Sequence, residues 1–168
     1  MNIEKPNRDF VLGGIPPEPK RNNNPGLLAP GFWALVQKAQ KAVLDATGHE
    51  VYLFEGFRSG ERQRWLWGSS RTYPGPWLTN ARAGQSAHEY GLGADLVAKV
   101  DGQWSWDEDK IPYAQFVEIY KGVGLASAAP REQVHVEWIA PFEAKELADF
   151  VRLHGLPALW ARVFPKTV

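Results

Sequence analysis

The sequence predicts a single globular domain that mixes helices with short strands. Its 168 residues fit the usual size of one domain, and 44% hydrophobic residues suffice for one core. Residues 31–47 carry apolar side chains at spacings of three and four and end at Gly48, which predicts an amphipathic helix with a glycine stop. Runs of β-branched and aromatic residues predict strands at 51–54, 94–100 and 134–138.

The remaining elements follow from the same patterns. Residues 1–30, rich in Pro and Asn, predict an extended N-terminal arm, and residues 31–168 then form the single domain. Residues 70–85 contain prolines and glycines and predict a long loop, while Asp101-Gly102 predicts a turn. Further helices are expected at 61–67, 113–120 and 142–153, with a last helical turn at 156–163.

The composition excludes several classes of partner and metal ligand. Nineteen Lys and Arg balance nineteen Asp and Glu, so nucleic acid is not expected as the principal partner. No cysteine is present, so a metal site must be built from His, Asp and Glu. No apolar run is long enough for membrane insertion. The first thirty residues lack the apolar stretch of a signal peptide, and we therefore expect synthesis in the cytoplasm without one.

Two of the four histidines lie in segments unlike ordinary surface, at residues 86–95 and 132–137. A hydrolytic zinc ion takes three protein ligands and keeps one position for water, and His88, Asp95 and His135 supply such a set. The glycines at 91 and 93 permit a tight reversal that returns Asp95 beside His88. The alternative is that all three are hydrogen-bonded structural groups at turns and strand ends.

The alternation of side chains along a strand predicts which neighbours of His135 share its face. His135 and Glu137 share one face of the strand, while Val134, Val136 and Trp138 face the core. Glu132, at the strand entrance, is near enough to serve as general base for the attacking water.

Other polar residues near these segments each have more than one possible role. Glu137 is the rival base, or it orients a ligand or binds substrate. Arg58 stabilises an oxyanion, or it only pairs with Glu55 or Glu61 at the surface. Ser86 holds the substrate or the site loop. Both remaining histidines, at positions 49 and 154, are expected to be structural.

The motifs resemble those of a known family. The pattern Ser86-x-His88-x-x-Gly91-x-Gly93-x-Asp95 resembles the signature of the VanY-like zinc peptidases and departs from it only in glycine for alanine at position 93. These peptidases comprise D-alanyl-D-alanine carboxypeptidases, dipeptidases and L-alanyl-D-glutamate endopeptidases, including phage endolysins. Two further segments, Glu132-x-x-His135-x-Glu137 and Phe57-Arg58-Ser59, are similar to the family's other motifs and occur in the same order.

The resemblance implies a fold, a cofactor and a substrate. The fold is α+β, similar to hedgehog and D-Ala-D-Ala peptidases, with a small antiparallel sheet carrying the zinc site and helices packed on one side. One Zn²⁺ is held by His88, Asp95 and His135. Glu132 and Arg58 are then catalytic, and Ser86 and Glu137 bind the substrate, the stem peptide of bacterial peptidoglycan.

The bond to be cleaved is less well defined. Residues 78–86 resemble the L-alanyl-D-glutamate endopeptidases of endolysins and autolysins, which favours a cut within the stem peptide by a phage or prophage endolysin that reaches the wall after release. Those enzymes commonly have Asp at the position of Glu132, and Glu is usual in the alternative, the D-alanyl-D-alanine carboxypeptidases. A second alternative is a non-catalytic zinc-containing binding module, against which Glu132 argues. A monomer is expected.

Overall fold

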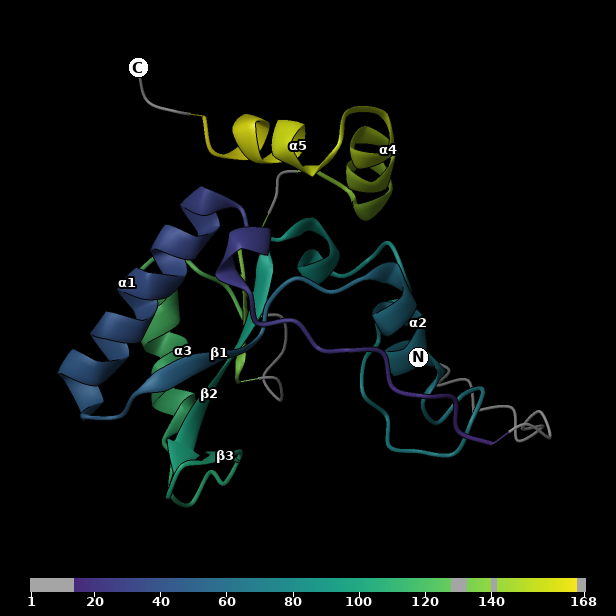
Figure 1. The fold of residues 1–168 in the computed structure, drawn as a ribbon. Helices are drawn as coiled ribbons and strands as arrows, with labels where there is room; N and C mark the ends of the chain where they lie inside the picture. The colour runs from purple at the N-terminus through teal and green to yellow at the C-terminus, as the bar shows by residue number, and fades with distance from the viewer. Residues whose placement is uncertain (1–13, 128–132, 140–141, 166–168) are drawn as a thin grey trace, which may run out of the picture.

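The computed structural model describes residues 14–127, 133–139 and 142–165 (Figure 1). The described helices are α1 (Pro30–Thr47), α2 (Gly60–Gly68), α3 (Tyr113–Gly122), α4 (Ala144–His154) and α5 (Leu156–Val163), with 3₁₀ turns η1 (Pro25–Leu27) and η2 (Ala87–Tyr90). The strands are β1 (Val51–Glu55), β2 (Gly93–Val100), β3 (Gln103–Ser105) and β4 (His135–Glu137). These elements confirm the predicted α+β class.

The sheet is small and antiparallel throughout, as expected, and β2 is its central strand. β1 pairs along one edge of β2, from Val51 opposite Ala98 to Glu55 opposite Asp95. The other edge is shared, because β4 pairs with residues 93–95 at the beginning of β2 and β3 pairs with residues 98–100 at its end. The start of β2 therefore lies between β1 and β4, where polar side chains of three segments can meet.

One face of the sheet is covered by α1 and α3, which lie together on the same side of the strands in Figure 1. Four residues of α1, spaced three to four apart, are fully buried against the sheet: Phe32, Val36, Ala39 and Val43. From β2 the alternate residues Ala94, Leu96 and Ala98 enter the same core. The α1 helix ends at Gly48 in the left-handed conformation, with φ of 73°, as the glycine stop predicts. The opposite sheet face is thereby left for Asp95 and its neighbours.

β1 contains a bulge that affects this open face. Leu53 pairs with Leu96, and Glu55 pairs with Asp95, so Phe54 is an extra residue without its own partner on β2. Leu53 packs against the core, whereas both Phe54 and Glu55 make their contacts on the other side. Two consecutive side chains thus serve the open face, which regular alternation would not allow.

Several element bounds differ from the sequence prediction. β3 was not expected, because its three residues contain one apolar side chain and follow the Asp101-Gly102 turn, whose residues both have positive φ. α3 extends to Gly122 and α4 begins at Ala144, and these shifts fall within the uncertainty of helix ends. The expected last turn is a full eight-residue helix, α5.

Residues 14–24 have no regular secondary structure and lead into η1, and the segment 14–29 is tied to the domain by hydrogen bonds. The carbonyl oxygen of Pro16 accepts from the Trp65 indole at 2.9 Å, and that of Asn22 accepts from the Gly56 N–H at 2.7 Å. Ala29 N–H donates to the Gly91 carbonyl at 2.9 Å, next to the predicted ligand turn. In the part of the chain that the structure describes, no helix combines the length and apolarity needed to cross a bilayer.

Candidate metal site

His88 and Asp95 are brought together by a tight reversal between η2 and β2. η2 ends at Gly91, which adopts φ of 67°, a conformation that favours glycine. Gly93 has a different role, because a Cβ built there would lie 2.8 Å from the backbone nitrogen of His88. Gly91 supplies the turn and Gly93 supplies the close approach, so the predicted reversal is observed with separate functions for its two glycines.

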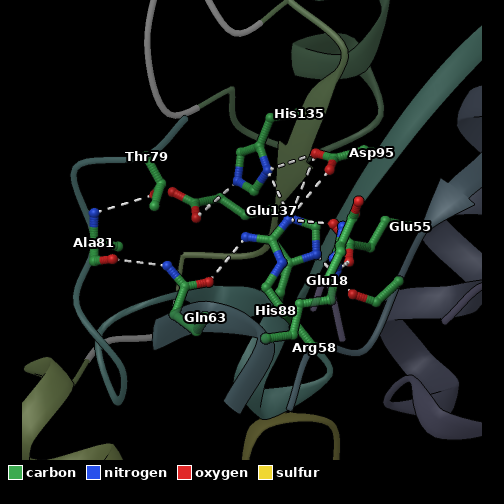
Figure 2. A network of polar contacts seen from close by, with 12 residues as sticks. Glu18, Glu55, Arg58, Gln63, Thr79, Ala81, His88, Asp95, His135 and Glu137 are labelled. Carbon is green, nitrogen blue, oxygen red and sulfur yellow. Dashed lines mark hydrogen bonds and ion pairs between the residues drawn. The ribbon is translucent and has the colours of Figure 1, made fainter. Parts of the chain in front are cut away.

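The third residue, His135, arrives through strand pairing, since it lies directly opposite Asp95 in the β2–β4 ladder. Nε2 of His88 lies 3.1 Å from Nδ1 of His135 (Figure 2). Asp95 Oδ1 is 3.4 Å from the His88 nitrogen and 3.2 Å from the His135 nitrogen. The three atoms form a nearly equilateral triangle. Because each residue contributes one ligand atom, the three could together hold a metal ion.

The triangle fits a tetrahedral zinc ion. Zinc binds His nitrogen at about 2.0–2.1 Å and carboxylate oxygen at about 2.0–2.2 Å, so neighbouring ligand atoms of a tetrahedron are about 3.3–3.5 Å apart. The observed sides of 3.1–3.4 Å need only a slight opening to accept the ion. A three-ligand set of two imidazoles and one carboxylate leaves the fourth position for water or substrate, as in hydrolytic zinc sites.

Each histidine is oriented by a partner on its other ring nitrogen. Nδ1 of His88 lies 2.6 Å from the carbonyl oxygen of Gly56 and donates to it, which leaves the Nε2 lone pair for a metal. Nε2 of His135 lies 3.2 Å from the Glu137 carboxylate, which leaves Nδ1 free in the same way. This contact favours a role for Glu137 in orienting the candidate metal ligand His135.

The ionisation of the cluster suits a cation. Burial raises the pKa of Asp95, but His88 and His135 outweigh it and hold that pKa well below its usual value. Burial lowers the pKa of His135, yet the hydrogen bonds and charges of Asp95 and Glu137 raise it to about 9. The hydrogen bond from His135 lowers the pKa of Glu137. Two carboxylates therefore stay ionised beside His135, whose additional proton a bound metal would displace.

Arg58 lies inside this network and not at the surface. Its side chain is 9% exposed, and its guanidinium donates to Glu55 at 2.7 Å, to Gln63 at 2.9 Å and to Asp95 Oδ2 at 3.3 Å. The alternative was a surface pair with Glu55 or Glu61. Arg58 does pair with Glu55, but the surface location is wrong because this pair is buried. Arg58 holds the second oxygen of Asp95 while the first faces the two histidines.

The sequence did not indicate the place of two residues in the site: Glu55, which was expected only as a surface partner of Arg58, and Gln63. Glu55 is 3% exposed and accepts from both Arg58 and Arg62, and Arg62 continues to Glu18 of residues 14–29 at 2.9 Å. Gln63 is fully buried and joins Arg58 to the carbonyl of Ala81, 2.7 Å away, in the long loop (Figure 2). An acidic residue ending an apolar strand run was the available signal for Glu55, whereas Gln63 offered none.

The other predicted site residues have separate outcomes. Ser86 is buried at the N-cap of η2, where its N–H donates to Glu89 at 3.3 Å, and this favours support of the site loop. Glu132 lies outside the described residues, so its role as base stays a prediction. The histidines at positions 49 and 154 make tilted ring contacts with Phe116 and Phe150, in keeping with structural roles.

Within the described residues, the antiparallel sheet has four strands and carries a His-Asp-His cluster, an arrangement that agrees with the predicted resemblance to VanY-like zinc peptidases. The chain is 38% identical over 95 residues to peptidoglycan L-alanyl-D-glutamate endopeptidase CwlK of Bacillus subtilis. The match covers 52% of this chain and 57% of CwlK, so the chain spans little more than half of that relative's length. No family model matches the chain.

The chain is also similar to solved structures. The D,D-pentapeptidase VanY of the VanB-type resistance cassette, in complex with Zn(II), superposes with a TM-score of 0.50 at 18% identity, over 71% of this chain and 77% of VanY. The L-Ala D-Glu endopeptidase ChiX of Serratia marcescens matches with a TM-score of 0.48 at 20% identity, over 69% of this chain and 84% of ChiX.

Proposed function

We propose that this chain is a zinc-dependent peptidoglycan hydrolase that cleaves the stem peptide, with the L-alanyl-D-glutamate bond as its first target. The triangle of His88, Asp95 and His135 atoms carries the proposal, because its dimensions and its oriented ring nitrogens suit a three-ligand zinc site. CwlK, which shares 38% identity over 95 residues, is a peptidoglycan L-alanyl-D-glutamate endopeptidase and supports this choice of bond.

In the mechanism, the chain's own residues prepare the site and move the proton. A zinc ion in this position supplies a Lewis acid that polarises the scissile carbonyl and makes water more acidic. Glu132, three residues before His135 in the sequence, is the proposed base that takes a proton from the attacking water and delivers it to the leaving amine. Glu137 orients His135, and Arg58 fixes Asp95.

Arg58 was expected to stabilise the oxyanion, and its contacts favour a positioning role. Both terminal nitrogens of the guanidinium already donate to protein acceptors, Gln63 on one side and Glu55 with Asp95 on the other. A fixed positive charge beside Asp95 still adds to the favourable potential for developing negative charge in a poorly solvated site. The oxyanion role remains a proposal.

The test measures metal content and new amino termini released from purified peptidoglycan by wild type, by chelated and zinc-restored protein, and by Glu132→Ala. We expect activity to vanish with chelator, return with zinc, and be absent from Glu132→Ala while zinc stays bound. Product sequencing then distinguishes an internal cut from free D-alanine, the product of the alternative D-alanyl-D-alanine carboxypeptidase. Zinc binding without cleavage of any wall chemotype would instead support the binding-module alternative.

The biological setting is also a proposal. We expect the protein to act as a phage or prophage endolysin that is made in the cytoplasm and reaches the wall after release. Detection of the protein in the medium of intact, growing cells would contradict this setting without affecting the proposed chemistry.

A further inference from the structure

The open face of the sheet carries a cluster of aromatic side chains that the proposed chemistry does not use. Four residues of β1, β3 and the segment after β3 form this aromatic platform: Tyr52, Phe54, Trp104 and Trp106. The Phe54 ring meets Trp104 and Trp106 edge to face at 5.1 and 5.0 Å, and Tyr52 meets Trp104 at 6.5 Å. Trp106 is 50% exposed and Tyr52 is 39% exposed, so the platform presents ring surface to solvent.

The platform lies on the same sheet face as the metal cluster. Along β2 the alternate residues Asp95, Val97 and Lys99 point to this face, and Trp104 is the cross-strand partner of Lys99. Phe54 belongs to the bulge next to Glu55, which pairs with Asp95. At about 3.3–3.4 Å per residue, the platform extends from the level of Asp95 to about 13 Å along the strand.

Two cations complete the platform. The Arg21 guanidinium stacks over the Phe54 ring at 3.9 Å, and the Lys99 ammonium lies over Trp104 at 4.5 Å and over Tyr52 at 5.1 Å. Both cations are hydrogen-bond donors, and the exposed Trp106 ring offers aromatic surface whose electron density attracts polarised C–H groups. A pyranose ring matches this surface, because it has C–H groups on its faces and oxygen acceptors around its rim.

We infer that this platform binds the glycan strand of peptidoglycan and places the adjoining stem peptide across the metal site. The inference rests on the proposed function. The L-alanyl-D-glutamate bond is separated from the sugar by the lactyl group and one alanine, a span of about 7 Å, whereas the terminal D-alanyl-D-alanine bond is about 17 Å away. The Phe54 end of the platform is level with Asp95, so a sugar held there lies within the span of about 7 Å to the bond nearer to the glycan, a span that would not reach from the far end.

The first experiment measures binding alone. Glycan strands freed of stem peptides are titrated into the full-length, zinc-loaded protein, and the dissociation constant is measured by calorimetry. We expect saturable binding that Trp106→Ala weakens at least tenfold. Trp77→Ala is the matched control, because Trp77 is 51% exposed and lies on the 70–85 loop, off the sheet face. Absent binding by wild type, or equal weakening by both variants, would overturn the inference.

The second experiment measures cleavage of a disaccharide-linked stem peptide and of the same peptide without sugar. We expect wild type to favour the glycan-linked substrate through a lower KM, and Trp106→Ala to lose that preference while cutting the free peptide as wild type does. Equal KM values of wild type for the two substrates would refute a glycan site. If wild type cuts neither substrate, the proposed function fails, and the binding experiment still decides the glycan site independently.

Discussion

Gly93→Ala tests whether the close approach of η2 to β2 sets the metal geometry. The added Cβ would lie 2.8 Å from the His88 nitrogen and 3.1 Å from two atoms of Ala87. Two of these three contacts are backbone atoms, so relief to an ordinary 3.4 Å or more requires the chain to shift by about 0.6 Å, an overpacking that costs about 1–3 kcal/mol. That shift falls between two ligands, His88 and Asp95, whose binding atoms are 3.4 Å apart.

We therefore expect Gly93→Ala to lower the free energy of unfolding by about 1–3 kcal/mol and to weaken zinc binding by about tenfold, or about 1.4 kcal/mol. Denaturant unfolding and competition with a zinc chelator measure the two quantities. Gly122→Ala is the control, because a Cβ at the end of α3 meets nothing within 4 Å. If Gly93→Ala keeps wild-type stability and zinc affinity, the reasoning is refuted. The test is demanding, because the VanY-like signature that this chain resembles has alanine at the position of Gly93.

Four further predictions follow from the contacts of the cluster. Glu137→Ala removes the acceptor of the His135 ring, and we expect zinc affinity to fall about 10–100-fold, measured by chelator competition; unchanged affinity would show that the ring needs no such partner. Because the His135 pKa is raised to about 9, a proton competes with the metal below that pH, so the zinc association constant should rise about tenfold per pH unit between pH 7 and 9. The same raised pKa of His135 increases the free energy of unfolding of the metal-free protein. This contribution is fully present below about pH 6.5 and is lost as the pH rises through about 9. A free energy of unfolding that does not change with pH would contradict it. Arg58→Lys keeps the charge but cannot donate to Glu55, Gln63 and Asp95 together, and unfolding should show a loss of about 1–3 kcal/mol.

Local patterns in the sequence predict most of the elements and the three candidate ligands. Spacing of apolar residues locates α1 and β2, and a glycine between two chemically suitable residues indicates a reversal there. The pairing of Asp95 with His135 across 40 residues is a tertiary fact, and it was accessible only through the resemblance of both motifs to one family.

Features that depend on register or on buried partners escaped the sequence. The bulge that puts Phe54 and Glu55 on one face breaks the period of two on which strand prediction depends. Arg58 has the same sequence neighbours whether its pair with Glu55 is exposed or buried, and only packing decides between these settings. β3 was too short for any pattern.

The tie between α5 and the metal turn bears on how the protein folds. Trp160 donates its indole N–H to the carbonyl of Tyr90 at 2.8 Å, a contact between residues 70 positions apart, and its ring lies 3.1 Å from where a Cβ of Gly91 would be. The same Cβ position would also meet backbone atoms of Leu27 and Ala29, at 2.8 and 3.3 Å. During synthesis, His88 and Asp95 emerge from the ribosome long before Trp160, so the turn that carries them acquires its last support late. Zinc capture should therefore be a late event in folding, with a rate limited by these long-range contacts.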